Sequence, residues 1–219
     1  NHHGCFFDRD AKECLRKINC RMENSSLFLR KTKVMVITWG TSWVYKHKSS
    51  GRIVANCHKF PAGDFDHYRL GVSDVVSLYV NLLQELFAEM PELEVVFTVS
   101  PVRHWKDGAH GNQVSKAVLL LAIDELVRRF TQVSYFPSFE IVMDELRDYR
   151  FYAEDMLHLS AQGIHYIWER FRETYMTAQA RDMMKQVDKL NKILLHRPLD
   201  AKDEASGLQK KEAIAALQQ

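Results

Sequence analysis

The chain of 219 residues carries 30 lysines and arginines against 28 acidic residues, and 46% of its residues are hydrophobic. This balance is typical of a globular protein and excludes a general electrostatic reason to bind nucleic acid or an anionic membrane. The longest uninterrupted apolar run, Ala117–Ile123, is far too short to cross a bilayer, so we expect no membrane span.

The first half of the chain predicts helices around a short strand. A helix is expected at Ala11–Met22, and the β-branched run Val34–Thr38 predicts a buried strand that ends in a glycine turn. A second extended piece is expected at Arg52–Ala55. Apolar residues then recur at helical spacing, which predicts a helix that Ser73 caps and that stops before Pro91.

The second half alternates strands with helices. Glu94–Val99 and Val133–Phe136 predict strands, and between them a loop to Asn112 is followed by a helix that runs to Leu126. This alternation implies parallel crossovers. We therefore predict an α/β fold, a three-layer α/β/α sandwich with a mainly parallel sheet.

The C-terminal part is predicted to be helical. Ser160 is expected to cap a helix that reaches Tyr175, because apolar residues recur at helical spacing between them. Residues 176–195 are strongly helical in pattern, and residues 200–219 are rich in Ala, Lys, Glu and Gln. We expect one domain over residues 1–175 and a helical extension over residues 176–219.

Asp155 and His158 lie just before the helix that Ser160 caps. A carboxylate so close to an imidazole fixes its tautomer and raises its basicity, as a general base in acyl transfer requires. The same spacing also arises by chance, with the aspartate capping a helix and the histidine packing. Spacing alone leaves both interpretations open, and the catalytic one also needs a nucleophile.

Three polar segments follow predicted strands: Gly40, Ser100–His104, and the segment that leads to His158. Sites in parallel α/β sheets gather at the carboxyl ends of the strands. We therefore expect these segments to meet at one edge of the sheet.

Candidates for an oxyanion hole are Gly40, Thr41, Ser42 and Asn56. Glycine lets a substrate approach the backbone closely, and the amide of Asn56 is a further donor. Both segments also fit ordinary turns.

Candidates for substrate binding are Arg103, His104 and His58. Arg103 fits a substrate carboxylate or a developing negative charge. It equally fits an ion pair with one of the acids between Asp144 and Asp155, so its role stays open.

Neither a metal nor a cofactor is expected. Histidines and aspartates are available as ligands, but neither H-E-x-x-H nor a comparable spacing is present. The four cysteines lack C-x-x-C spacing, which indicates free thiols and favours the cytoplasm. Cys57 beside His58 is a poor thiol nucleophile candidate, because sequence neighbours rarely face each other. The short basic clusters lack an aromatic platform, so no nucleic-acid partner is expected.

Several sequence blocks occur in one order along the chain. They are ITWGTSWVY from Ile37, VANCHK from Val54, TVSPVRH from Thr98, GNQVSKA from Gly111, YFPSFEI from Tyr135 and DELRDYRFYAEDMLH from Asp144. Together they resemble the GSCFA domain family. The resemblance implies a three-layer α/β fold related to the SGNH/GDSL hydrolases, in which an early serine is the nucleophile and a late D-x-x-H supplies acid and base.

Asp155 and His158 match the late block of that pattern. Thr41 and Ser42 fall where related enzymes often carry an oxyanion asparagine, and Asn56 is a substitute for it. The resemblance implies a serine hydrolase or esterase acting on an acyl ester, such as an acetyl group on a carbohydrate. The rival is a non-catalytic binding or scaffolding module that uses the same cleft.

The Gly-Ser-Cys-Phe-Ala block that names the family is not among the 219 residues, and His2–Phe6 looks instead like a later family segment. We therefore expect an N-terminally shortened chain without the first strand and the serine. Such a chain exposes apolar surface at an unpaired sheet edge and is a poor catalyst on its own.

Overall fold

The computed structural model describes residues 6–54, 57 and 60–195 of the chain. The chain divides into two compact units, Asn1–Gly163 and Ile164–Gln219. Helix α1 (Ala11–Leu29) of the first unit is longer than the predicted Ala11–Met22. The first unit also contains both sheets. Cys14, Cys20 and Cys57 are free thiols.

A parallel sheet of three strands lies at the centre of the first unit. Its strand order is β1-β5-β6, with β1 at Val34–Trp39, β5 at Glu94–Val99 and β6 at Val133–Phe136. Val34 of β1 pairs with Glu94 of β5, and Val95 of β5 pairs with Val133 of β6. The predicted strands and their parallel arrangement are confirmed.

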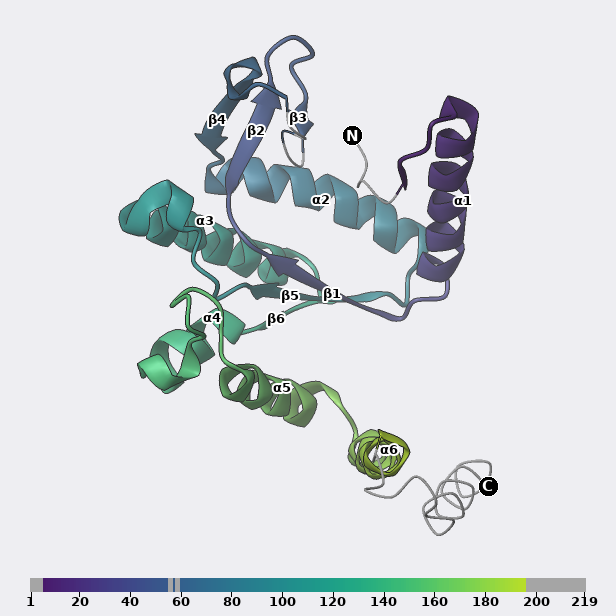
Figure 1. Cartoon of the computed structure of the whole chain (residues 1–219), viewed down its shortest axis with the longest axis vertical. Coiled ribbons are helices and arrows are strands. Elements are labelled where there is room, and N and C mark those ends of the chain that lie inside the picture. Colours follow the sequence, from purple (N-terminus) through teal and green to yellow (C-terminus); the bar gives the residue numbers. More distant parts are fainter. Residues whose placement is uncertain (1–5, 55–56, 58–59, 196–219) are drawn as a thin grey trace. The chain divides into compact units, whose positions relative to one another are not determined.

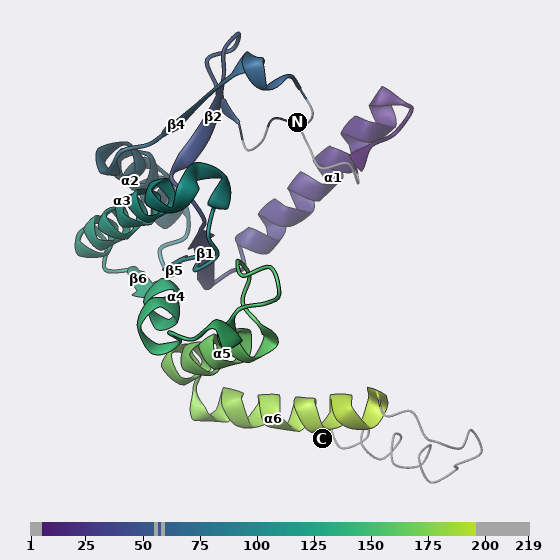
Figure 2. The same cartoon turned by 60° about the vertical axis from the view of Figure 1, so that its left-hand side comes forward.

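Two long helices cover one face of this sheet. They are α2 (Val72–Glu89) and α3 (Gly108–Arg129), and Figure 1 and Figure 2 both show them on the same side of the strands. Their apolar stripes pack against alternate residues of β5, with Leu83 and Leu126 fully buried. Alternation along the strand therefore sends Phe97 into this helix–sheet core.

The other face of the sheet carries a short helix, α4 (Ser138–Glu140), which continues as a π-helix at Ile141–Glu145. The Ser138 hydroxyl donates to the Val99 carbonyl at 2.8 Å and accepts from the Thr98 hydroxyl at 2.5 Å. These bonds fasten the chain that leaves β6 to the end of β5.

Strand β1 is at an edge of the sheet and pairs only with β5 in the part of the chain that the structure describes. Met35 and Ile37 pack against the core. The alternate residues Val34 and Val36 are 52% and 48% exposed. One face of β1 is therefore apolar and accessible to solvent.

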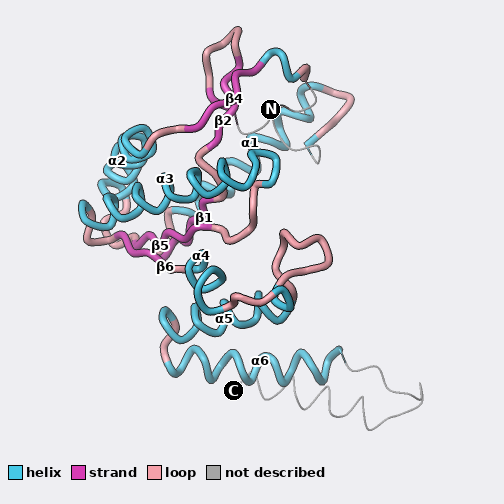
Figure 3. Tube along the Cα trace, turned by 90° about the vertical axis from the view of Figure 1, so that its left-hand side faces the viewer, coloured by secondary structure: helices cyan, strands magenta, loops and turns pink. Residues whose placement is uncertain are grey.

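A second, antiparallel sheet was not predicted (Figure 3). Its order is β3-β2-β4, with β2 at Trp43–His47, β3 at Ile53–Val54 and β4 at Phe65–Arg69, just after a 3₁₀ turn at Ala62–Asp64. The extended piece predicted at Arg52–Ala55 corresponds to β3, and Ala55 lies outside the described residues.

Two predicted helix starts are wrong. Helix α2 begins at Val72 with Gly71 as its N-cap, because the Asp74 carboxylate, rather than Ser73, closes the turn by accepting the Gly71 N–H at 2.8 Å. Helix α3 begins at Gly108, directly after a 3₁₀ turn at Trp105–Asp107. The loop predicted to reach Asn112 is therefore shorter.

The predicted C-terminal helices are present. Helix α5 spans Ala161–Tyr175 and starts where Ser160 was predicted to cap it, since the Ser160 hydroxyl accepts the Gly163 N–H at 3.3 Å. Helix α6 spans Ala178–Leu195, within the second unit, and residues 196–219 lie outside the described part of the chain. None of the helices that the structure describes combines the length and the apolarity that a bilayer crossing needs.

Candidate active site

Asp155 and His158 lie on one closed loop that follows a 3₁₀ turn at Tyr149–Phe151. The Ala153 N–H donates to the His158 carbonyl at 2.8 Å, and this bond brings the two sides of the loop together. The loop is thus a fixed turn, held by its own backbone.

The Asp155 carboxylate is hydrogen-bonded on both oxygens. Its Oδ2 lies 2.5 Å from His158 Nδ1, and its Oδ1 accepts the backbone N–H groups of Leu157 and His158, each at 2.9 Å. The hydrogen bond with the His158 side chain, followed by the two backbone bonds, lowers the pKa of Asp155 to about 2. An ionised carboxylate only accepts, so Nδ1 carries the proton and Nε2 of a neutral imidazole carries the lone pair.

Met156 bends the backbone between these two side chains. Its φ of 58° lies in the left-handed region, which residues with a Cβ seldom occupy. The bend turns the next N–H groups back toward the Asp155 carboxylate. Local strain at Met156 thus accompanies the orientation of the pair.

The pair lies at the surface. The His158 side chain is 66% exposed and the Asp155 side chain is 48% exposed. Within the described residues, no hydroxyl is hydrogen-bonded to His158 Nε2. The imidazole is therefore accessible to solvent.

The carboxyl ends of β1 and β5 are joined by a buried lysine of α3. Lys116 Nζ donates to the carbonyls of Gly40 and Ser100, each at 2.6 Å. Next to it, the Ser115 hydroxyl accepts the Ser42 N–H at 2.8 Å. Two segments that were predicted to meet at the edge of the sheet are therefore in contact through one helix.

The oxyanion candidates at the end of β1 differ in their surroundings. Ser42 is 2% exposed, and its hydroxyl lies 3.1 Å from the Ser115 hydroxyl, so it is engaged in the interior. The Thr41 hydroxyl lies 3.0 Å from the same Ser115 oxygen. The backbone N–H groups of Gly40 and Thr41 have no hydrogen-bond partner within the described residues. They are the free donors of this turn.

His104 lies beside Gly40. A Cβ added to Gly40 would be 3.3 Å from His104 Nε2, and the His104 N–H donates to the Asn112 side chain at 2.9 Å. Burial, followed by the nearby Lys116 charge, lowers the pKa of His104. A neutral imidazole is therefore favoured next to the Gly40 turn.

Arg103 connects the β5 end to the loop of Asp155 and His158. Its guanidinium lies 5.3 Å from the centre of the Tyr152 ring, and Nη2 is 3.5 Å from the Tyr152 hydroxyl. No acid among the described residues pairs with Arg103. Arg103 and Tyr152 line a cavity of about 220 Å³.

A larger cavity of about 440 Å³ adjoins the Gly40 turn, and Thr41 and His104 lie in its wall. Part of that wall is a stack of rings in which His67 lies between Trp43 and Tyr45. Asn56 and His58, the remaining candidates, lie outside the residues that the structure describes.

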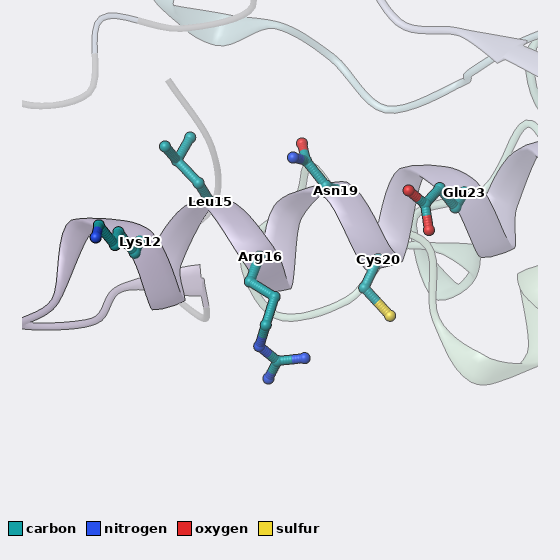
Figure 4. A pocket seen from close by; sticks show the side chains of 6 residues that line it. All are labelled: Lys12, Leu15, Arg16, Asn19, Cys20 and Glu23. Carbon is teal, nitrogen blue, oxygen red and sulfur yellow. The ribbon is translucent and has the colours of Figure 1, made fainter.

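The hollow along α1 contains no predicted site residue (Figure 4). Its lining residues are Lys12, Leu15, Arg16, Asn19, Cys20 and Glu23. The picture shows Leu15 and Asn19 on one side of the helix and Arg16 and Cys20 on the other, so they do not converge. Within the described ranges, no group of three His, Cys, Asp or Glu side chains is arranged to hold a metal ion.

Ser115 and Lys116 were missed as site residues. The sequence carried a signal for them. Leu119 follows Ser115 by four residues and Lys116 by three, and Ala122 follows Leu119 by three, so all four lie on one helix face. A lysine and a serine on an apolar face predict buried polar contacts.

A family model described as the GSCFA family matches residues 1–171. The chain belongs to the GSCFA family. The match covers Asp155, His158 and the Gly40 turn of this GSCFA protein. No curated protein and no solved structure matches the chain.

Proposed function

We propose that this GSCFA protein carries the acid and base of a serine hydrolase that acts on acyl esters, such as O-acetyl groups of carbohydrates. The observation that supports this most strongly is the 2.5 Å bond between Asp155 and His158 Nδ1, which leaves Nε2 free. A carboxylate that fixes the imidazole in this tautomer is what a general base for a serine needs.

In the proposed reaction, His158 Nε2 takes the proton of a serine while the serine oxygen bonds to the acyl carbon. Asp155 stabilises the imidazolium that forms. The oxyanion accepts hydrogen bonds from the backbone N–H groups of Gly40 and Thr41. His158 then returns the proton to the leaving alkoxide as its bond to the acyl carbon breaks, and water repeats the sequence to release the acid.

The proposal places the serine outside these 219 residues, because they contain no Gly-Ser-Cys-Phe-Ala block. Support comes from β1, whose outer edge is unpaired within the described residues. A further parallel strand at this edge would carry the serine to the ends of β1 and β5. It would also extend the sheet of a three-layer, SGNH-like domain over residues 1–175, with residues 176–219 as a helical extension.

A second candidate is a non-catalytic binding module that uses the same surface. It is favoured by the 66% exposure of the His158 side chain, which is high for a general base. Under this hypothesis Arg103 and His104 would bind a partner or ligand, and no serine hydrogen-bonded to His158 would be needed.

Labelling by a fluorophosphonate, which reacts with activated serines, separates the two candidates. We would compare the 219-residue chain with a form extended upstream to the family block, each with and without His158→Ala. His165→Ala is the matched control, since His165 is also exposed but lies away from Asp155 in the sequence. The proposal predicts labelling of the extended form alone, lost in His158→Ala and kept in His165→Ala. Absence of labelling in both forms would favour the binding module.

A further inference from the structure

Lys116 is a buried cation without an acidic partner. Only 1% of it is exposed, and no carboxylate among the described residues forms an ion pair with it. A buried ammonium is costly unless its protons are bonded. Its two bonds, both to backbone carbonyls, therefore define its role.

Those carbonyls belong to Gly40 at the end of β1 and Ser100 at the end of β5, each 2.6 Å from Nζ. Charge-assisted bonds of this kind are stronger than bonds between neutral groups. Lys116 thus holds the carboxyl ends of two neighbouring strands at a fixed separation.

The Gly40 carbonyl and the Thr41 N–H belong to one trans peptide group. Such a group is planar, so its N–H points away from whatever its carbonyl contacts. The ammonium draws electron density toward the Gly40 carbonyl oxygen, and this also polarises the Thr41 N–H at the other end of the peptide group. The next N–H, that of Ser42, is held by the Ser115 hydroxyl at 2.8 Å, so α3 fixes the turn on both sides of Thr41.

We propose that Lys116 is a positioning residue that aims and strengthens the Thr41 N–H as a donor to a carboxylate or oxyanion at this edge of the sheet. The inference rests on the proposed function, which assigns the Gly40–Thr41 turn to the oxyanion. The ligand class is an anionic oxygen on carbon, as in the acid that an esterase releases.

His104, whose ring borders Gly40, lies within the field of the Lys116 charge. Burial is the main cause that lowers the pKa of His104, and the Lys116 charge is the next. A field that disfavours a cation at His104 favours an anion at the same edge.

The test is a titration of the ¹⁵N-labelled chain with sodium acetate at pH 6.5 and constant ionic strength, read at the Thr41 amide. Acetate should shift this amide saturably. In Lys116→Met the affinity should fall by about tenfold, because the Thr41 N–H loses its fixed direction and the polarisation that the ammonium supplies. Lys116→Gln, which keeps a donor but loses the charge, should give an intermediate value. Lys106→Met is the control, because Lys106 bonds the Tyr45 hydroxyl at 2.6 Å in the wall of the same cavity.

An acetate-insensitive Thr41 amide, or equal affinities in the wild type and Lys116→Met, would overturn the inference. If Lys116→Met does not fold, Lys116→Gln decides in the same way. The titration needs no nucleophile, so it fails or succeeds independently of fluorophosphonate labelling. Acetate binding without labelling would contradict the hydrolase alone, and labelling without a Lys116 effect would contradict the positioning role alone.

Discussion

The Ser160 N–H donates to the Phe151 carbonyl at 2.8 Å, which closes the base of the loop that carries Asp155 and His158. Ser160 also accepts the Gly163 N–H in the first turn of α5. The residue that caps the helix therefore anchors the loop as well, and the start of α5 determines where the pair is held.

Gly163→Ala should destabilise this anchor. A Cβ at Gly163 would lie 2.9 Å from the Phe151 carbonyl oxygen, a backbone atom that has to move. We expect a loss of about 1–3 kcal/mol in the free energy of unfolding, which exceeds the gain in helix propensity. Urea denaturation measures it. Gly63→Ala is the control, since a Cβ there meets nothing within 4 Å, and equal effects of the two changes would contradict the expectation.

Met156 should tolerate glycine better than a β-branched residue. At a φ of 58°, glycine relieves strain but loses chain entropy, so Met156→Gly should stay near the wild type in unfolding free energy. Met156→Ile should cost about 1–3 kcal/mol. Thermal and urea unfolding of both variants measure the difference. If isoleucine matched glycine, the backbone strain assigned to Met156 would be wrong.

The carboxyl of Asp155 should titrate well below its ordinary range. Its pKa falls from 3.8 to about 2, chiefly through the bond with the His158 side chain. A lowered carboxyl pKa adds stability that is present above the ordinary value, so this contribution disappears as the pH falls from about 4 to about 2. Carboxyl ¹³C shifts measured against pH should show a higher Asp155 pKa in His158→Ala. An unchanged value would mean that the imidazole does not support the carboxylate.

Lys116 should make stability rise in alkaline solution. Burial lowers its pKa from 10.5 to about 8, so the folded chain releases this proton before the unfolded chain does. Between about pH 8 and pH 10.5 the unfolded state binds more protons, and the free energy of unfolding should increase. Urea unfolding of the wild type relative to Lys116→Met isolates this effect. A difference that is constant across the window would show that Lys116 is not desolvated.

Sequence patterns predicted the parallel sheet well but missed the antiparallel one. Strands β1, β5 and β6 are runs of β-branched and aromatic residues, so their composition identifies them. Strand β4 reads Phe-Asp-His-Tyr-Arg, with little apolar alternation. It is held by pairing with β2, where Tyr45 stacks on His67, and this contact is distant in sequence.

The same division applies to the site. The bond between Asp155 and His158 spans three residues, so local spacing offered it as one of two interpretations, beside a capping aspartate and a packed histidine. The Lys116 bond to Gly40 spans 76 residues and depends on how α3 crosses the sheet. Such a contact is set by tertiary packing. The sequence indicated it only through a lysine on an otherwise apolar helix face.

The most direct test of the account is the protonation of His158, read from its side-chain ¹⁵N resonances at pH 7.5. We predict a proton on Nδ1, a bare Nε2, and a shift of this balance in Asp155→Asn. A proton on Nε2, or a tautomer that is unchanged in Asp155→Asn, would contradict the claim that Asp155 prepares His158 as a base.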